Sequence, residues 1–228
     1  MKIGIVGDLH LPFSHPNYQR FCIDTFEKWN VSKIHFIGDI ADQHATSNWT
    51  ANVNGWSAGH EFNEALKDVQ SWYKLFPAAS VSIGNHDERI QRKAFAAGLP
   101  DRYLKSYRNT WQTPRWRWEL QHTFDGVQYL HGTGSSGRDA AYTRARDTRQ
   151  SVVMGHIHSF PGVKYHANDS SLIFGLNVGC GIDATSYAAN YQRQYATRPV
   201  LGCGVVLDGH AAFFVPMDLG PKSKYRRK

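Results

Sequence analysis

Gly84-Asn85-His86-Asp87 is the stretch of sequence around which the fold is predicted. It follows a short apolar run, Val81-Ser82-Ile83, and precedes a helical-looking segment, so it should form the bend between a buried strand and a helix. Open α/β sheets bind their ligands at such bends, beyond the carboxyl ends of the strands. An Asn amide oxygen can bind a divalent metal and a His can donate a proton, which suits a hydrolytic site. Asn and His are also common in purely structural turns, so the rest of the chain must decide between these interpretations.

Length and composition predict one globular domain. The chain has 228 residues, of which 41% are hydrophobic and 20% charged, and single α/β domains often reach this size. We see no linker and no internal repeat, so the predicted domain spans residues 1–228. Within it, residues 98–120 are the one candidate for an embellishment, which could border a substrate site, and residues 221–228 form a basic tail.

Charge and cysteine content indicate the compartment and the kind of partner. A formal net charge of +7 favours a polyanionic partner or substrate, although part of the excess is the tail, which could equally be a solvated end. No apolar run is long enough to cross a bilayer, and the first apolar stretch meets Asp8 before a signal-peptide core could form. Three cysteines without metal-like spacing fit free thiols. We therefore expect a cytoplasmic protein without a membrane partner.

Polar side chains follow the first two predicted strands directly. Residues 2–7 read as a strand that ends before Asp8 and His10. In an extended segment these two side chains would point the same way, one offering a hard oxygen and the other a nitrogen. Residues 33–37 read as a second strand, which ends before Asp39 and Asp42. A carboxylate after each apolar run is the pattern by which an open sheet gathers ligands at one edge.

The same pattern recurs in the second half of the chain. A hairpin turn at Asp125-Gly126 leads into a strand at 127–130 that delivers His131. A strand at 151–154 ends before His156 and His158, whose i, i+2 spacing is the most metal-like pair in the sequence. The glycine- and serine-rich run at 132–137 lacks the Gly-Lys-Ser/Thr of a P-loop. After residue 163, short strands separated by turns suggest a second, more antiparallel sheet.

The intervening segments have helical or loop character. Periodic apolar residues predict helices at 17–30, 61–76, 88–97 and 138–149. Residues 43–60 read as a long loop near the site. The histidines at 44, 60 and 122 belong to no motif, and we expect them in loops or at the surface.

Residues 103–118 have the most unusual composition. Arg108, Arg115 and Arg117 alternate with tryptophans, among them Trp116. Interleaved Arg and aromatic residues are typical of surfaces that contact phosphates and stack on bases, which predicts a substrate-binding rim beside the site. The alternative is that the tryptophans cover the edge of the core while the Arg side chains lie over them.

Taken in order, these five blocks resemble the signature of the calcineurin-like metallophosphoesterase superfamily: Asp-x-His, Gly-Asp-x-x-Asp, Gly-Asn-His-Asp/Glu, a later His, and Gly-His-x-His. All five are intact between residues 3 and 158. The resemblance, closest to the small stand-alone type of bacteria and bacteriophages, implies an α/β fold. That fold is a four-layer α/β/β/α sandwich of two mixed sheets, with a dinuclear metal site at the strand ends.

Matching positions also imply roles for individual residues. One metal would be held by Asp8, His10, Asp39 and His158, and the other by Asp39, Asn85, His131 and His156, with Asp39 bridging. Two divalent cations about 3.5 to 4 Å apart can hold a bridging hydroxide and clamp a phosphoryl group. Manganese is our first choice of metal, with iron, zinc, cobalt and nickel as alternatives. His86 would be the catalytic histidine and Asp42 the carboxylate that orients it, although Asp42 could instead cap a helix.

The function predicted from these residues is a dinuclear, metal-dependent phosphoesterase that uses metal-bound hydroxide, with a nucleotide or nucleic-acid phosphodiester as substrate. Protein Ser/Thr phosphatases of the superfamily continue the second block with Arg-Gly, whereas this chain has Gln43-His44. That difference removes the best support for a phosphoprotein substrate. A phosphomonoesterase acting on a phosphoprotein or a small metabolite remains an alternative. A non-catalytic, basic nucleic-acid-binding protein is a further alternative, which intact His86 and Asp42 disfavour.

Overall fold

The computed structural model describes residues 1–47, 52–189 and 196–226. Its first sheet has six strands in the order β11-β10-β1-β2-β3-β4, and its second has five in the order β5-β6-β7-β9-β8. The strands of the first sheet are β1 (Lys2–Val6), β2 (Lys33–Phe36), β3 (Ala79–Ser82), β4 (Arg117–Glu119), β10 (Gly202–Leu207) and β11 (Ala211–Pro216). Those of the second are β5 (Gln121–Phe124), β6 (Val127–Leu130), β7 (Val152–Met154), β8 (Gly162–Ala167) and β9 (Leu172–Asn177).

Each sheet mixes parallel and antiparallel pairs. Strands β1 to β4 run parallel, β10 pairs antiparallel with β1, and β11 pairs antiparallel with β10 at the edge of the sheet. In the second sheet, β6, β7 and β9 are parallel, while β5 and β8 are antiparallel edges. Of the described strands from residue 162 onward, β8 and β9 therefore belong to the second sheet, whereas β10 and β11 belong to the first. The sequence did not show that β10 returns to the first sheet beside β1.

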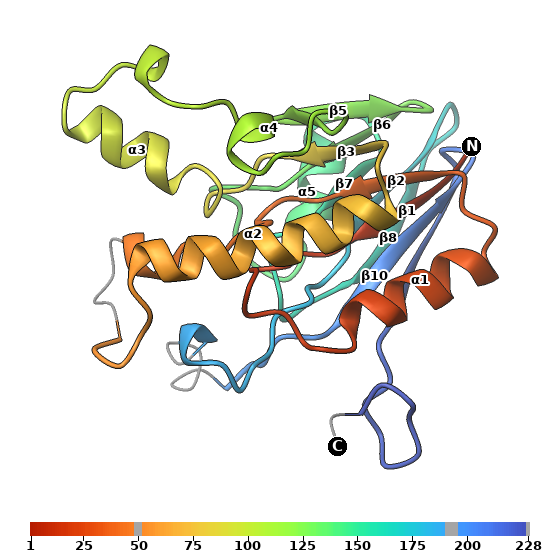
Figure 1. The fold of residues 1–228 in the computed structure, drawn as a ribbon. Coiled ribbons are helices and arrows are strands. Elements are labelled where there is room, and N and C mark those ends of the chain that lie inside the picture. Colours follow the sequence, from red (N-terminus) through yellow and green to blue (C-terminus); the bar gives the residue numbers. More distant parts are fainter. Residues whose placement is uncertain (48–51, 190–195, 227–228) are drawn as a thin grey trace.

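The helices cover the outer faces of the two sheets. Helices α1 (Tyr18–Lys28) and α2 (Ala58–Leu75) lie on the same side of the first sheet (Figure 1), and α5 (Ala140–Thr148) packs on β7 and β9. Helix α3 (Arg89–Ala96) extends beyond the sheets (Figure 1), and α4 (Tyr107–Thr110) and two short 3₁₀ helices, η1 (His44–Thr46) and η2 (Asp101–Tyr103), complete the fold.

Three apolar clusters separate these layers. One joins α1 and α2 to the first sheet, a second lies between the two sheets, and a third joins α5 to the second sheet. In the middle cluster, Ile3 and Ile5 of β1 pack with Val127, Tyr129 and Leu176 of the second sheet. The predicted α/β fold, a four-layer sandwich of two mixed sheets, is confirmed.

Several local predictions can be compared with the structure. The hairpin turn at Asp125 and Gly126 is present, with both residues at positive φ. The predicted loop at 43–60 contains η1 and the start of α2, and its residues 48–51 lie outside the described residues, as do residues 227–228 of the basic tail. His122 is buried and bonded to the Val81 carbonyl oxygen, so its prediction as a loop or surface residue was wrong.

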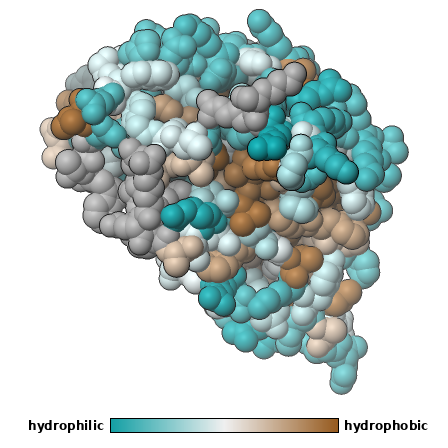
Figure 2. Space-filling view, turned by 90° about the horizontal axis from the view of Figure 1, so that it is seen from below, coloured by the Kyte–Doolittle hydropathy of each residue, from teal (hydrophilic) through white to brown (hydrophobic). Residues whose placement is uncertain are grey.

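One side of the surface is mixed in hydropathy (Figure 2). In the view of Figure 2, an apolar area lies in the middle of one side and is surrounded by hydrophilic residues. Within the part of the chain that the structure describes, no helix is both long and apolar enough to cross a membrane.

Candidate metal centre

The candidate site lies where the carboxyl ends of β1, β2, β3, β6 and β7 meet. These strands belong to two sheets, and each is followed by one of the polar blocks singled out in the sequence. The fold brings together all seven predicted ligand positions. They are Asp8, His10, Asp39, Asn85, His131, His156 and His158.

The close approach of these strand ends depends on glycine. A Cβ atom at Gly84 would collide with Asp39 Oδ1, and one at Gly155 would collide with Asp8 Oδ1. A glycine before each block therefore lets the backbone of one loop pass beside the carboxylate of another. This explains why Gly stands beside most of the polar blocks in the sequence.

The side chains converge by a different local geometry from the one predicted. β1 ends at Val6, and His10 has φ 50°, so Asp8 and His10 are not successive residues of one extended strand. Asp39 and His156 also have positive φ, at 47° and 66°. Such angles are uncommon for residues other than glycine, and they cluster at functional sites. The alternation argument was therefore wrong in its mechanism, although the side chains do meet.

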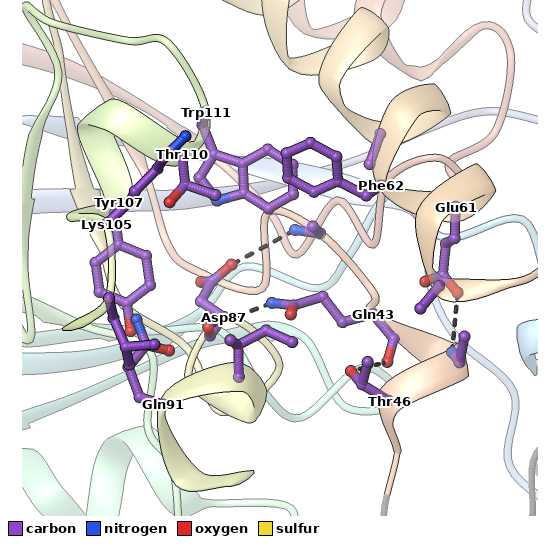
Figure 3. A pocket seen from close by; sticks show the side chains of 16 residues that line it. Gln43, Thr46, Glu61, Phe62, Asp87, Gln91, Lys105, Tyr107, Thr110 and Trp111 are labelled. Carbon is purple, nitrogen blue, oxygen red and sulfur yellow. Dashed lines mark hydrogen bonds between the residues drawn. The ribbon is translucent and has the colours of Figure 1, made fainter. Parts of the chain in front are cut away.

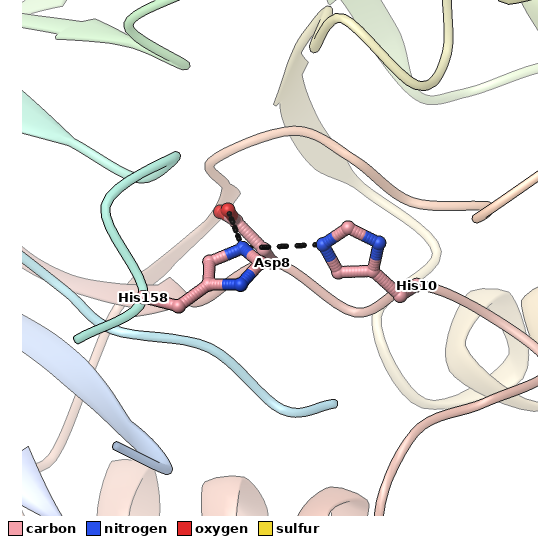
Figure 4. Close-up of side chains that lie close together, drawn as sticks. All are labelled: Asp8, His10 and His158. Atoms are coloured by element: carbon pink, nitrogen blue, oxygen red, sulfur yellow. Dashed lines mark hydrogen bonds and ion pairs between the residues drawn. The ribbon is translucent and has the colours of Figure 1, made fainter. Parts of the chain in front are cut away.

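One candidate metal position lies between Asp8, His10 and His158. The Nε2 atoms of the two histidines are 3.2 Å apart, and His158 Nε2 is 2.9 Å from Asp8 Oδ2 (Figure 4). Two imidazole nitrogens that face each other beside a carboxylate match the mixed nitrogen and oxygen ligand sets of divalent transition metals.

A second candidate position lies between Asp39, His131 and His156. His131 Nε2 is 3.2 Å from Asp39 Oδ2 and 3.0 Å from Asn85 Oδ1. Asp39 Oδ2 is also 3.8 Å from His10 Nε2, so this carboxylate faces both positions. The structure thus places Asp39 between the two ligand sets, as the resemblance implies for a bridging ligand.

The surroundings of these side chains fit a metal. Asp8 Oδ1 is buried and has no hydrogen-bond partner among the described residues, which is costly unless a cation or water satisfies it. The second nitrogen of His10 lies 2.7 Å from Asp42 Oδ1, and that of His131 lies 3.2 Å from the Ile37 carbonyl oxygen. Metal-binding histidines usually have such a partner, which fixes ring orientation and tautomer.

Buried carboxylates give the site a negative potential. Burial opposes ionisation of Asp39 and Asp8, but nearby histidines outweigh it and lower the pKa of both carboxyl groups. Burial also opposes protonation of His131, yet Asp39 and Asp8 raise its pKa to about 10. Burial, and next the Asp39 charge, raise the pKa of Asp87 to about 7. The site therefore attracts positive charge, which divalent cations would supply.

His86 and Asp42 lie beside these ligands. His86 Nδ1 is 2.8 Å from the Asp42 carbonyl oxygen and 3.2 Å from its Oδ1. The shorter contact of the Asp42 carboxylate is with His10, so Asp42 contacts both a candidate metal ligand and the candidate catalytic histidine. Its side chain does not cap η1, whose N-cap residue is Gln43.

Arg89 is a site residue that the sequence analysis missed. It lies in the first turn of α3, and its Nη2 donates to His86 Nε2 at 3.1 Å, while its Nη1 donates to the Asp42 and Gln43 carbonyl oxygens. Its spacing of three residues from His86 on a helical turn was the available signal. Burial lowers the pKa of His86, but Asp39 and Asp42 outweigh burial and raise it, against the opposing charge of Arg89.

An open cleft of about 620 Å³ lies over the candidate metal positions. Beside Asp39, Asn85, His86, His156 and His158, it is lined by residues that no motif pointed to. They are Ser135, Ser136, Gly137, Ile157, Ser159, Phe160 and Thr197. The glycine- and serine-rich run after β6 thus forms one wall of the cleft, and Phe160, with the Arg138 guanidinium 5.0 Å from its ring centroid, forms another.

The predicted Arg and Trp rim is not part of this cleft. Trp116 is 1% exposed, packs on Phe36 and donates its indole N–H to the Phe76 carbonyl oxygen, so it cannot stack on a base. Arg117 pairs with Ser80 at the beginning of β3, the end away from the site. Arg108 and Arg115 are exposed, but neither lines the cleft. The rim prediction was therefore wrong for Trp116 and Arg117, and the core-edge alternative describes the tryptophan correctly.

Comparisons with known proteins give a likeness in structure alone. No family model and no curated protein matches the sequence. A metallophosphoesterase from Sphaerobacter thermophilus is 18% identical, with a TM-score of 0.49, over 90% of this chain and 82% of that one. Vacuolar protein sorting 29 from Cryptosporidium parvum is 12% identical, with a TM-score of 0.46, over 90% and 83%. The phosphoesterase YfcE from E. coli is 13% identical, with a TM-score of 0.44, over 90% and 87%.

These likenesses are too distant to carry an argument about activity. The five polar blocks, the two mixed sheets and the convergence of the candidate ligands at the strand ends are observed in the chain itself. In these features the chain resembles the calcineurin-like metallophosphoesterases, a superfamily that includes the three proteins just named.

Proposed function

We propose that this protein is a metal-dependent phosphoesterase with two divalent cations. The observation that carries the proposal is the two neighbouring ligand groups, Asp8–His10–His158 and Asp39–His131–His156, with Asp39 Oδ2 3.8 Å from His10 Nε2 of the first group. The buried Oδ1 of Asp8, which has no partner among the described residues, supports it. Asp8, His10, Asp39 and His158 would hold one cation, and Asp39, Asn85, His131 and His156 the other. When bound, the cations would supply Lewis acidity toward the phosphoryl oxygens and lower the pKa of the attacking water.

The chain's own residues account for the remaining requirements of phosphate-ester hydrolysis. His86 faces the cleft beside Asp39, where it can stabilise the phosphoryl group or protonate the leaving oxygen. The Asp42 carboxylate contacts the imidazole rings of both His86 and His10 and can orient them. Arg89 brings a guanidinium to the same histidine, and guanidinium groups bind phosphate oxygens well.

We further propose a nucleotide or nucleic-acid phosphodiester as the substrate. Supporting this choice, Phe160 offers a ring on which a base can stack, and Ser135 and Ser136 offer hydroxyl groups for a phosphate. The formal charge of +7 also favours a polyanion. A phosphomonoesterase remains the second candidate, because the cleft is open and its hydroxyl groups would serve a monoester equally.

The test combines metal analysis with activity. Protein purified without chelator and then titrated with Mn²⁺ should bind two ions, and should then hydrolyse an aryl phosphodiester faster than the matching aryl monoester. His86→Ala should lower turnover by roughly two to four orders of magnitude with both metals retained. His60→Ala, a change at an exposed histidine of α2, is the matched control and should leave turnover unchanged. A stoichiometry that stays at one under saturating Mn²⁺ would contradict the dinuclear proposal, and preference for the monoester would contradict the substrate.

A further inference from the structure

A second cavity lies beside the loop that carries Asn85 and His86. It has a volume of about 300 Å³ and is enclosed by residues 41–46, α2, the beginning of α3 and residues 104–111. It shares no lining residue with the metal cleft, although Asp87 of the same loop forms part of its wall (Figure 3). The volume is at the lower end of the range for small-molecule pockets. The cavity is therefore a separate compartment, suited to a molecule of one or two rings.

The cavity has aromatic walls. Phe62 of α2 and Trp111 are stacked, with ring centroids 5.2 Å apart and an angle of 27° between the rings. Tyr107 lies on another side of the cavity, beside Gln91 (Figure 3). A planar ring could pack against these aromatic faces, which favour offset or edge contacts.

Several polar groups of the wall have no hydrogen-bond partner among the described residues. The Gln91 Oε1 atom is buried and accepts no hydrogen bond from them. Among the hydrogen bonds of residues 1–47, 52–189 and 196–226, none involves the Trp111 indole N–H or the Tyr107 hydroxyl group, and both residues line the cavity. Buried polar groups are nearly always paired in native proteins, so a ligand that donates to Gln91 Oε1 would satisfy this buried atom. Acceptors on the same ligand could receive hydrogen bonds from the Trp111 and Tyr107 groups.

The acidic groups of the wall are already satisfied. The Asp87 carboxylate accepts from the backbone N–H groups of Ile40 and Gly84. Glu61 accepts from those of His44 and Ala45. Glu61 and Asp87 therefore offer no free carboxylate for a cation. The other polar side chains of the wall include the Gln91 amide, the Trp111 indole N–H, the hydroxyl groups of Tyr107 and Thr110, and the Lys105 ammonium group.

We propose that this cavity binds a planar heteroaromatic molecule of the nucleobase class. The ring lies between the aromatic walls, a ring N–H or amino group donates to Gln91 Oε1, and ring acceptors receive hydrogen bonds from Trp111 and Tyr107. The proposal concerns a site apart from the metal cleft and does not depend on the proposed hydrolysis.

Free adenine and free guanine are suitable probes, titrated into the full chain with Mn²⁺ present and followed by calorimetry and by tryptophan fluorescence. At least one should bind in the micromolar to low millimolar range. Gln91→Leu and Tyr107→Phe should each weaken binding by about 5- to 10-fold, the effect of one net hydrogen bond. Tyr103→Phe is the matched control, because Tyr103 is 74% exposed and lies outside the cavity, and its affinity should equal that of the parent.

Three outcomes would overturn the proposal. The first is that neither base binds at any concentration up to its solubility limit. The second is that cyclohexanol binds as tightly as the bases, which would mean that the cavity selects apolar molecules by size and not by aromatic rings or hydrogen bonds. The third is that Asn85→Ala abolishes binding while Gln91→Leu and Tyr107→Phe, both shown to be folded by thermal unfolding, bind as the parent does, which would place the base in the metal cleft.

Discussion

Replacement of Asp42 by Asn tests whether this carboxylate orients a metal ligand or the catalytic histidine. Its Oδ1 lies 2.7 Å from His10 Nδ1 and 3.2 Å from His86 Nδ1, and the side chain is 5% exposed. Burial by itself raises the pKa of Asp42, but hydrogen bonds from His10 and His86 outweigh it and hold the pKa far below its usual value. Because Asn keeps the shape and removes the charge, the substitution weakens both contacts without opening a cavity.

The expected magnitude follows from the shorter contact. A hydrogen bond to a charged group contributes about 1.5–3 kcal/mol, which corresponds to about a 10- to 150-fold change in an equilibrium constant. Partners of metal-binding histidines typically change metal affinity by about 10- to 100-fold. We therefore expect Asp42→Asn to weaken binding of one of two Mn²⁺ ions by one to two orders of magnitude, and to lower turnover at saturating Mn²⁺ by about tenfold or more.

Equilibrium dialysis against buffered Mn²⁺ gives the affinities, and turnover is measured at the Mn²⁺ concentration that saturates each variant. Asp101→Asn is the control, because Asp101 is an exposed residue of η2, and it should match the parent in both assays. The reasoning is refuted if Asp42→Asn binds Mn²⁺ as the parent does while its turnover falls, since Asp42 would then act on His86 alone.

Three further predictions concern the site, the core and pH. Arg89→Lys keeps the positive charge but loses the planar guanidinium group that contacts both His86 and the Asp42 carbonyl oxygen. Turnover should therefore fall about tenfold or more, while equilibrium dialysis should show an unchanged affinity for Mn²⁺. Trp116→Ala should lower the free energy of unfolding, measured by urea titration, by about 3–5 kcal/mol. Arg117→Ala should change it by less than about 0.5 kcal/mol. Equal effects of the two substitutions would contradict the burial of Trp116. Burial, and next the charge of His122, hold the pKa of His35 well below 6.5. Below about pH 6.5 the unfolded state therefore binds more protons than the folded state. The contribution of neutral His35 to the free energy of unfolding should be complete above about pH 6.5 and should fall as the pH is lowered. Urea titrations should show a smaller fall for His35→Gln.

Arg89 and the second cavity illustrate what the sequence pattern could not show. Arg89 meets His86 because a helical turn begins directly after the loop. Its spacing of three residues from His86 was the available signal in the sequence, and such a spacing by itself does not identify a contact. The cavity is formed by four separate segments of the chain, residues 41–46, α2, residues 87–91 and residues 104–111, so no single stretch of sequence predicts it. The wrong prediction of a substrate-binding rim at residues 103–118 has the same cause. Composition shows that Trp and Arg residues alternate, but it does not show which of them are buried by packing against another part of the fold.

By itself, the sequence predicted most of the central strands and helices and the chemistry of the candidate ligands. The apolar runs that precede the five polar blocks read as strands, and carboxylate, amide and imidazole groups can bind a metal in any fold. Only the tertiary structure decided which sheet receives β10 and β11, that His122 and Trp116 are buried, and that Asp42 contacts His10 more closely than His86. The reason is physical: periodicity and side-chain type are local properties, whereas burial and pairing depend on which distant segment packs against a residue.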